Sequence, residues 1–424
     1  MPKSPYSVFQ RLISGGEKLA HIDLAYLARG GFWLGVGQIS SGIGSLLLAL
    51  VFANYLPKET YGLYKYALSI AGLLSIFTIP GMLISLNRAS AQGLEGSLVP
   101  ATKERMRWSY VGGLIGLCAA LYYALTNNSD LALLLLIVSI SLPFFDVFTT
   151  FNSYLLGKQD FRRSTLISTA IQLLATGALV IIALLSKNVF LILTVYFLSY
   201  SILRFISYRY IVARIPLTTP ADPDAISYGK HLSVMNILST VASNIDNLIL
   251  FYLLGPVQVA IYSITTAAPD QLKSVLGFLT TLFFPLFTQE NETEVRRSIL
   301  YRFLFFFLIS LAGILVYVAL APLFFTLFFH QYSQYVFLSQ VFAVSLLTIT
   351  FDPALLFLNA HKKIKEQYWS TTIGNVLQIV AIVLLAIMYG VWGVILARVI
   401  VRFLSNLLNV YFFYFPFRKH SSSN

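Results

Sequence analysis

The sequence predicts an all-α integral membrane protein, and three observations carry this prediction. Hydrophobic residues make up 57% of the 424 residues and charged residues 11%, whereas an ordinary soluble protein carries about 25% charged residues. The mean hydropathy is +0.77. The apolar residues gather in runs of about 20, the length of a helix that crosses a bilayer. None of the runs shows the strict alternation of a membrane β-barrel strand.

Twelve apolar runs follow one another along the chain. They cover residues 32–53, 63–86, 108–125, 131–155, 164–185, 189–211, 231–254, 264–287, 303–321, 335–357, 368–388 and 393–415. Each run must satisfy its backbone hydrogen bonds internally, so each is predicted to be a transmembrane helix. All four tryptophans fall near the ends of these helices, as in the aromatic belt at a membrane interface.

The distribution of lysine and arginine predicts the orientation, because these residues are enriched in cytoplasmic loops. With both termini in the cytoplasm, most of the 29 lysines and arginines fall on the cytoplasmic side, Arg105 and Arg204 among them. The outer side receives only Lys58, Lys65 and Lys187. Topology and anionic inner-leaflet lipid therefore account for most of the net charge of +12. No dense basic run indicates a nucleic-acid partner.

A segment with three prolines, Ile215–Ala225, divides the chain into two halves of six helices. Similar segments recur at equivalent places, such as residues 56–64 and 254–262. An even number of helices per half makes the repeat parallel, with a pseudo-two-fold axis along the membrane normal. The predicted parts are a cytoplasmic amphipathic lead-in, an N-lobe, a cytoplasmic linker, a C-lobe and a cytoplasmic tail, at residues 1–31, 32–211, 212–230, 231–415 and 416–424.

Seven ionisable residues fall inside the predicted helices. They are Asp146, Asp246, Asp270, Lys273, Asp352, Arg398 and Arg402. Each costs about 2.5–3.5 kcal/mol at the centre of a membrane helix, so the set indicates a hydrated path or mutual pairing. Asp270 and Lys273 are three residues apart and can neutralise each other. Arg398 and Arg402 share a helical face, where they either clamp a phosphate or pyrophosphate or pair with carboxylates near the interface.

The least apolar helix, residues 231–254, carries a continuous polar face. This stripe consists of Asn236, Thr240, Ser243, Asn244 and Asn247. A polar stripe of this length inside lipid is expected to face water or a polyhydroxyl substrate. The other interpretation is hydrogen bonding between helices, which membrane bundles also use.

Two motifs give the chain a family resemblance. The turn Tyr55-Leu-Pro-Lys-Glu-Thr-Tyr-Gly-Leu-Tyr64 and the segment Leu155-Leu-Gly-Lys-Gln-Asp-Phe-Arg-Arg163, together with twelve helices in two halves, resemble polysaccharide-exporter proteins. This family includes the Wzx-type lipid-linked oligosaccharide flippases of the multidrug/oligosaccharidyl-lipid/polysaccharide (MOP) superfamily. One departure is Ile79-Pro80-Gly81, where relatives often place an acidic residue before the glycine.

The resemblance implies a flippase with two lobes in a V, rocking between inward-open and outward-open states in the bacterial inner membrane. The implied substrate is an undecaprenyl-diphosphate-linked oligosaccharide, moved to the outer leaflet for polysaccharide or O-antigen biosynthesis. Polysaccharide polymerase and assembly proteins are the implied partners. The cations expected to hold the diphosphate are Arg398, Arg402, Lys273 and Arg88. A coupling proton or sodium ion, the only cofactor expected, would use the carboxylates of Asp246, Asp146 and Asp352.

Two other functions remain open. A drug/cation antiporter of the same superfamily would need an anionic, aromatic cavity, whereas the charges inside the predicted helices are mixed. A membrane-embedded glycan polymerase or ligase would need a sizeable outer loop with an acid/base set, and the outer loops are short. The five histidines are scattered and suggest no metal site. A transporter is therefore expected rather than an enzyme.

Overall fold

The computed structural model of the chain describes residues 24–215, 219–289, 292–361 and 363–415. Within these ranges the chain is helical, and its only extended pairing is an isolated bridge between Glu95 and Ala221. The predicted all-α class is thus confirmed. The predicted tail, residues 416–424, and most of the lead-in lie outside the described residues. The first helix already begins at Leu24, inside the segment predicted to be the lead-in.

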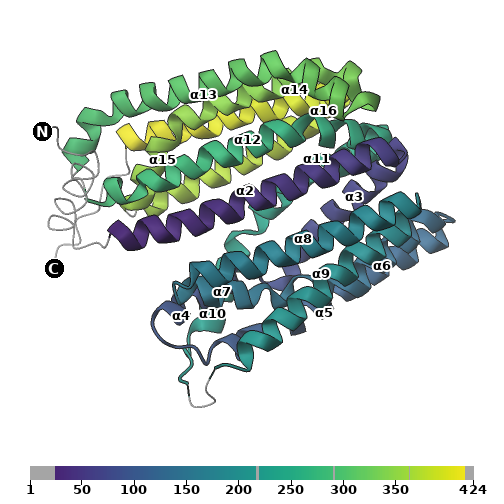
Figure 1. Cartoon of the computed structure of the whole chain (residues 1–424), viewed down its shortest axis with the longest axis horizontal. Helices are drawn as coiled ribbons and strands as arrows, with labels where there is room; N and C mark the ends of the chain where they lie inside the picture. The colour runs from purple at the N-terminus through teal and green to yellow at the C-terminus, as the bar shows by residue number, and fades with distance from the viewer. Residues whose placement is uncertain (1–23, 216–218, 290–291, 362, 416–424) are drawn as a thin grey trace, which may run out of the picture.

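The helices form two bundles (Figure 1). The N-terminal bundle comprises α2 (Leu24–Tyr55), α3 (Lys58–Leu74), η1 (Ser75–Thr78), α4 (Gly81–Ala91), α5 (Leu98–Leu125), α6 (Ser129–Phe145), η2 (Val147–Thr149), α7 (Thr150–Gly157), α8 (Phe161–Leu185) and α9 (Val189–Val212). The C-terminal bundle comprises α11 (Ile237–Leu254), α12 (Pro256–Gln289), α13 (Glu292–Phe328), η3 (His330–Tyr335), α14 (Val336–Ala343), η4 (Val344–Phe351), α15 (Asp352–Ala360) and α16 (Ile364–Tyr414). A short helix, α10 (Ala225–Met235), connects them.

Nine helices in the described ranges are long and apolar enough to cross a membrane, or up to ten if a bent pair counts as one span. The bent pair is α3–η1 with α4, at an angle of 53°. It bends where Ile79 has a φ of 49° and Pro80 cannot donate a backbone hydrogen bond. The 51-residue α16 is interrupted at Gly390, whose φ of 59° is not helical. The expected number of twelve spans stays a prediction.

The linker and α10 dock on the N-terminal bundle. The Gly96 amide donates to the Pro220 carbonyl at 3.0 Å, and the Asp222 amide donates to Ser97 Oγ at 2.8 Å. Helix α10 lies against α4, where the Gly81 amide donates to Ser233 Oγ at 2.9 Å. The chain enters the C-terminal bundle only after a break at Asn236, between α10 and α11.

Glu95 anchors the loop that receives the linker. Its carboxylate accepts hydrogen bonds from Lys158 and from the Tyr154 hydroxyl. Partial burial raises the pKa of Glu95, but the two hydrogen bonds and the charge of Lys158 lower it by more, so the pKa lies below its usual value. The loop is thus held by a carboxylate that stays ionised at neutral pH.

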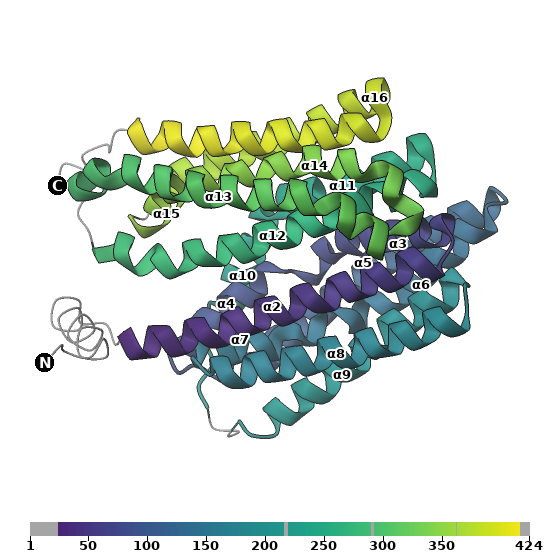
Figure 2. The same ribbon diagram turned by 45° about the horizontal axis from the view of Figure 1, so that its top comes forward.

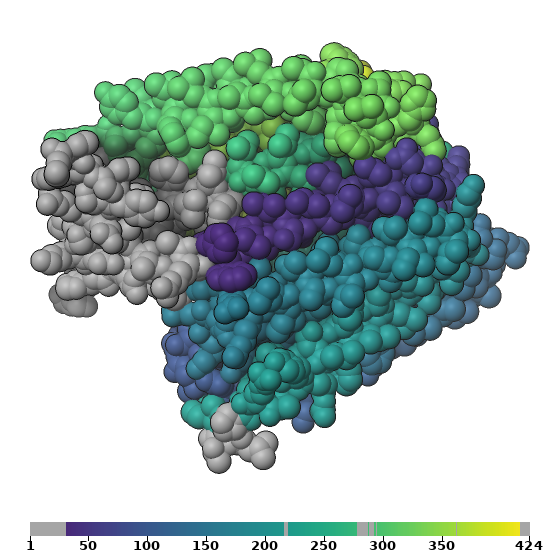
Figure 3. Space-filling model, in the orientation of Figure 1, coloured from purple at the N-terminus to yellow at the C-terminus, as the bar shows by residue number. Residues whose placement is uncertain are grey.

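The two bundles share a large hydrophobic core at the end opposite the linker. There Phe52 and Tyr64 of the N-terminal bundle belong to the same buried cluster as Ile261 and Phe329 of the C-terminal bundle. Toward the linker end each bundle has its own hydrophobic cluster, and the cluster around Met82 belongs to the N-terminal bundle. Helix α2 lies between the bundles and packs on α8 and α12 (Figures 2 and 3). The bundles are therefore joined most firmly at the end opposite the linker.

Candidate functional site

Arg398 of α16 forms a buried ion pair with Asp246 of α11. Its Nε donates to Asp246 Oδ2, which also accepts a hydrogen bond from the Tyr262 hydroxyl of α12. Asp246 Oδ1 is buried and has no hydrogen-bond partner among the described residues. The distant helix α16 thus meets the consecutive helices α11 and α12 at one carboxylate.

Arg402, one turn further along α16, pairs with a different carboxylate. Its Nη2 donates to Asp270 Oδ1 at 2.8 Å and its Nη1 to Ser345 Oγ at 2.9 Å. The guanidinium also lies 4.7 Å from the centre of the Phe342 ring. Arg398 and Arg402 therefore pair with separate aspartates. Carboxylate pairing was one of the two interpretations of these arginines, and a phosphate clamp was the other.

Lys273 and Asp352 complete this C-terminal charge cluster. Lys273 interacts electrostatically with Asp352 and Asp270 and with both arginines. The cluster has three cations and three carboxylates: Arg398, Arg402, Lys273, Asp246, Asp270 and Asp352. Its formal charge is zero, so the cost of placing ions in the membrane is reduced by mutual pairing. Arg88 lies elsewhere, on α4, with its guanidinium 5.3 Å from the ring centre of Tyr228.

The polar stripe of α11 faces the N-terminal bundle. Asn236, Ser239, Thr240, Ser243 and Asn244 line a cavity of about 360 Å³ together with residues of α3 and η1, Gly72 and Ser75 among them. Asn247 lies outside that lining and donates to Ser69 Oγ of α3 at 2.8 Å. Four members of the stripe thus line the cavity, and the fifth bonds between helices.

Arg398 connects the charge cluster to the polar cavity. Its Nη2 is 3.5 Å from the carbonyl oxygen of Ser243, which lines the cavity. Asn375, also on α16, donates to Ser239 Oγ of α11 at 2.7 Å. A guanidinium thus lies beside a cavity lined by hydroxyl and amide groups.

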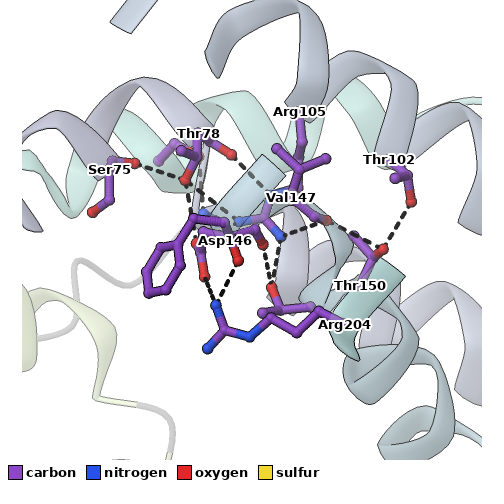
Figure 4. A network of polar contacts seen from close by, with 12 residues as sticks. Ser75, Thr78, Thr102, Arg105, Asp146, Val147, Thr150 and Arg204 are labelled. Carbon is purple, nitrogen blue, oxygen red and sulfur yellow. Dashed lines mark hydrogen bonds and ion pairs between the residues drawn. The ribbon is translucent and has the colours of Figure 1, made fainter. Parts of the chain in front are cut away.

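The third candidate carboxylate, Asp146, lies in a separate network within the N-terminal bundle (Figure 4). Arg105 Nη2 is 2.9 Å from Asp146 Oδ2, and Arg105 Nε donates to the Thr78 carbonyl at 2.8 Å. Arg204 Nη1 is 3.9 Å from Asp146 Oδ1 and donates to the Phe145 carbonyl at 2.5 Å. Arg105 is 0% exposed and lies on α5, so it is buried within the bundle and does not lie in a loop between helices.

Two further cations that were assigned to loops lie inside the N-terminal bundle. Lys65 of α3 and Arg204 of α9 line one cavity, although the sequence analysis placed them on opposite sides of the membrane. Both positions fall within predicted helices, at 63–86 and 189–211, and that signal could have found them. Arg105 gave no such signal, because α5 begins at Leu98, ten residues before the predicted start.

The family of the chain can be read from its sequence match. Residues 27–291 match the family model of the polysaccharide biosynthesis proteins, and this stretch is more than half of the chain. The chain belongs to this family. The match confirms the predicted resemblance to a family of polysaccharide proteins. A search of curated protein sequences gave no match.

Solved structures of MOP transporters share the fold of this polysaccharide biosynthesis protein. A MOP superfamily transporter from Pyrococcus furiosus is 15% identical, with a TM-score of 0.62, over 92% of this chain and 95% of that one. An outward-facing multidrug resistance MATE transporter is 16% identical with the same TM-score and coverage. The lipid II flippase MurJ, in an inward closed conformation, is 15% identical with a TM-score of 0.61, over 89% and 86%.

Proposed function

We propose that this family member is a flippase for an undecaprenyl-diphosphate-linked oligosaccharide, and that it works by ion-coupled alternating access. The observation that carries the proposal is the position of Arg398, which bonds to a residue lining the polar cavity of α11 and belongs to the C-terminal charge cluster. Guanidinium groups suit phosphate, and serine, threonine and asparagine suit sugar hydroxyls. The family match and the likeness in fold to a lipid flippase support the same function.

In this proposal the diphosphate replaces the aspartates as the partner of the three cations. Arg398 would turn from Asp246 toward the phosphate oxygens. Arg402 and Lys273 would turn from Asp270 and Asp352 in the same way. The released carboxylates would then take up a proton or sodium ion. Asp246 is the best placed for this role, because its Oδ1 is already buried without a partner in the described structure. Asp146, which two arginines contact, would couple through the N-terminal bundle instead.

We further propose a topology of twelve membrane spans in two lobes of six helices. If the linker end is cytoplasmic, the core shared by the two bundles closes the protein toward the outside of the inner membrane. Substrate would enter from the cytoplasmic side and leave when this core separates. Arg88, on α4 near the linker end, would meet the diphosphate first.

Deletion of the gene is expected to stop export of the surface glycan, and Arg398→Ala or Arg402→Ala is expected not to restore it. Each substitution removes a phosphate ligand and leaves an aspartate unpaired. Surface glycan should be measured at matched protein abundance. Arg107→Ala is the control, because Arg107 is 78% exposed and pairs only with Glu104. Normal export by both alanine variants would refute the diphosphate role. Drug sensitivity with normal glycan in the deletion strain would instead indicate an antiporter.

An apolar groove beside α2 suits the lipid part of the proposed substrate. Its volume is about 610 Å³, and it is lined by side chains of α2, α12 and α13, including Ile43, Leu272 and Val316. Gly42 and Gly313 also line it, and their lack of a side chain widens the groove. A polyprenyl chain would bury apolar surface there while the headgroup reaches the polar cavity.

Gly313→Phe is expected to reduce glycan export at least about tenfold, because a benzyl group would fill the groove. A β-carbon at Gly313 meets Leu276 Cδ1 at 3.4 Å, an ordinary contact, so the helix itself tolerates the change. Export and thermal stability should be measured together. Gly177→Phe is the control, since Gly177 on α8 has nothing within 4 Å of such a carbon. Export at the wild-type rate by the Gly313 variant would exclude the groove from the lipid path.

A further inference from the structure

The N-terminal bundle contains a cavity that the proposed function does not use. Its volume is about 300 Å³, at the lower end of the range for ligand pockets of about 300–1,000 Å³. Helices α2, α3, α8 and α9 enclose it. The lining has two cations, a glutamine and four tyrosines: Lys65, Arg204, Gln172, Tyr61, Tyr64, Tyr196 and Tyr200. A cavity of this size admits a small group rather than an oligosaccharide.

Lys65 has no carboxylate to neutralise it. Among the residues the structure describes, no hydrogen bond or ion pair involves its ammonium group. Its Nζ lies over the Tyr61 ring, 5.6 Å from the ring centre. An aromatic ring offsets part of the desolvation cost of a cation, but it does not supply a negative charge.

Arg204 is only weakly compensated. Its guanidinium contacts Asp146 at 3.9 Å, but that carboxylate already accepts the closer bond from the fully buried Arg105. The rings of Phe145 and Tyr200 lie 4.6 and 5.0 Å from the guanidinium. One aspartate thus serves two arginines, and with Lys65 the described residues around this cavity and Asp146 comprise three cations and one carboxylate.

The two bundles differ in this respect. The C-terminal charge cluster is formally neutral, whereas the described group of Lys65, Arg105, Arg204 and Asp146 has an excess of two positive charges. Unpaired charge inside a membrane protein is costly and is typically matched by a counter-ion or substrate. The excess faces the cavity, because Lys65 and Arg204 both line it.

We propose that this cavity is an anion-binding site that takes a phosphate group. Lys65 and Arg204 would contact the phosphate from two sides, and the Gln172 amide and tyrosine hydroxyls would donate to its remaining oxygens. The site is separate from the C-terminal charge cluster, so it stands whether or not Arg398 and Arg402 bind the substrate. The phosphate could be a free ion or the headgroup of a polyprenyl lipid.

The test is binding of two probes, inorganic pyrophosphate and farnesyl diphosphate, to the purified full chain in detergent, measured by calorimetry. Lys65→Gln is expected to weaken binding at least about tenfold, while Lys65→Arg retains it. Lys58→Gln is the matched control, since Lys58 lies on the same helix over the Tyr332 ring at 5.1 Å but does not line the cavity. Thermal unfolding of each variant shows that it is folded.

The outcomes separate this site from the proposed function. Binding that survives Arg398→Gln but falls in Lys65→Gln supports the N-terminal site, even if glycan export does not depend on either. Binding of both probes indicates the phosphate itself as the recognised group, and binding of farnesyl diphosphate alone indicates a lipid headgroup. Unchanged affinity of Lys65→Gln for both probes would overturn the proposal, as would loss of binding only in Arg398→Gln.

Discussion

Replacing Arg105 with alanine is expected to lower the free energy of unfolding by about 3–5 kcal/mol, the range for breaking a buried ion pair by removal of one partner. Arg105 is fully buried and binds Asp146, the Thr78 carbonyl and Thr149 Oγ1, at 2.9, 2.8 and 3.0 Å. These groups come from η1 and from the break between α6 and α7, so the guanidinium holds three chain segments together. Its loss leaves several polar groups buried without partners.

The measurement is the thermal midpoint and the yield of the purified variant in detergent. Arg105→Lys should recover little of the loss, because an ammonium group cannot reproduce the planar fork that serves three acceptors. Arg107→Ala, two residues along the same helix, changes an exposed pair and should cost about 0–1 kcal/mol. A midpoint of Arg105→Ala equal to that of Arg107→Ala would show that the network contributes no stability.

The sequence predicts the fold class because composition and run length follow directly from the bilayer. The break between α3 and α4 falls inside the single helix predicted at 63–86, although Pro80 in this apolar run is a residue that typically interrupts a helix. The break at Asn236 has no such mark. It arises because α10 packs on α4, through contacts such as Gly81 with Ser233 across 152 residues of chain. Contacts of this range are invisible to a periodic pattern.

The candidate site also combines features that local spacing predicts with features that only long-range contacts decide. Helical spacing predicts that Arg398 and Arg402 share a face, but their partners lie 152 and 132 residues away, so the sequence could not choose between pairing and a phosphate clamp. Counting basic residues by loop placed Lys65 and Arg204 in water. The count assumes that a cation near a helix end is solvated, whereas in this fold both face an interior cavity.

Gly62→Ala is expected to separate the two bundles at the end opposite the linker and to abolish glycan export. A β-carbon at Gly62 of α3 would lie 1.8 Å from the carbonyl oxygen of Pro256, the first residue of α12. Because that oxygen belongs to the backbone, no side-chain rotation relieves the clash, and α3 must move away from α12. These helices border the shared core, so the shift favours the state that is open at this end.

Maleimide labelling can detect this opening, since the single cysteine, Cys118, is exposed and can first be replaced by serine. Ala260→Cys then reports on the shared core, because Ala260 is 0% exposed. Labelling at this position should rise at least about tenfold with Gly62→Ala, as expected for an equilibrium shifted by about 1.4 kcal/mol or more. Gly177→Ala, the same substitution where no atom lies within 4 Å, should leave labelling and export unchanged. If Gly62→Ala also leaves both unchanged, the contact between α3 and α12 does not hold the bundles together, and alternating access must close at another surface.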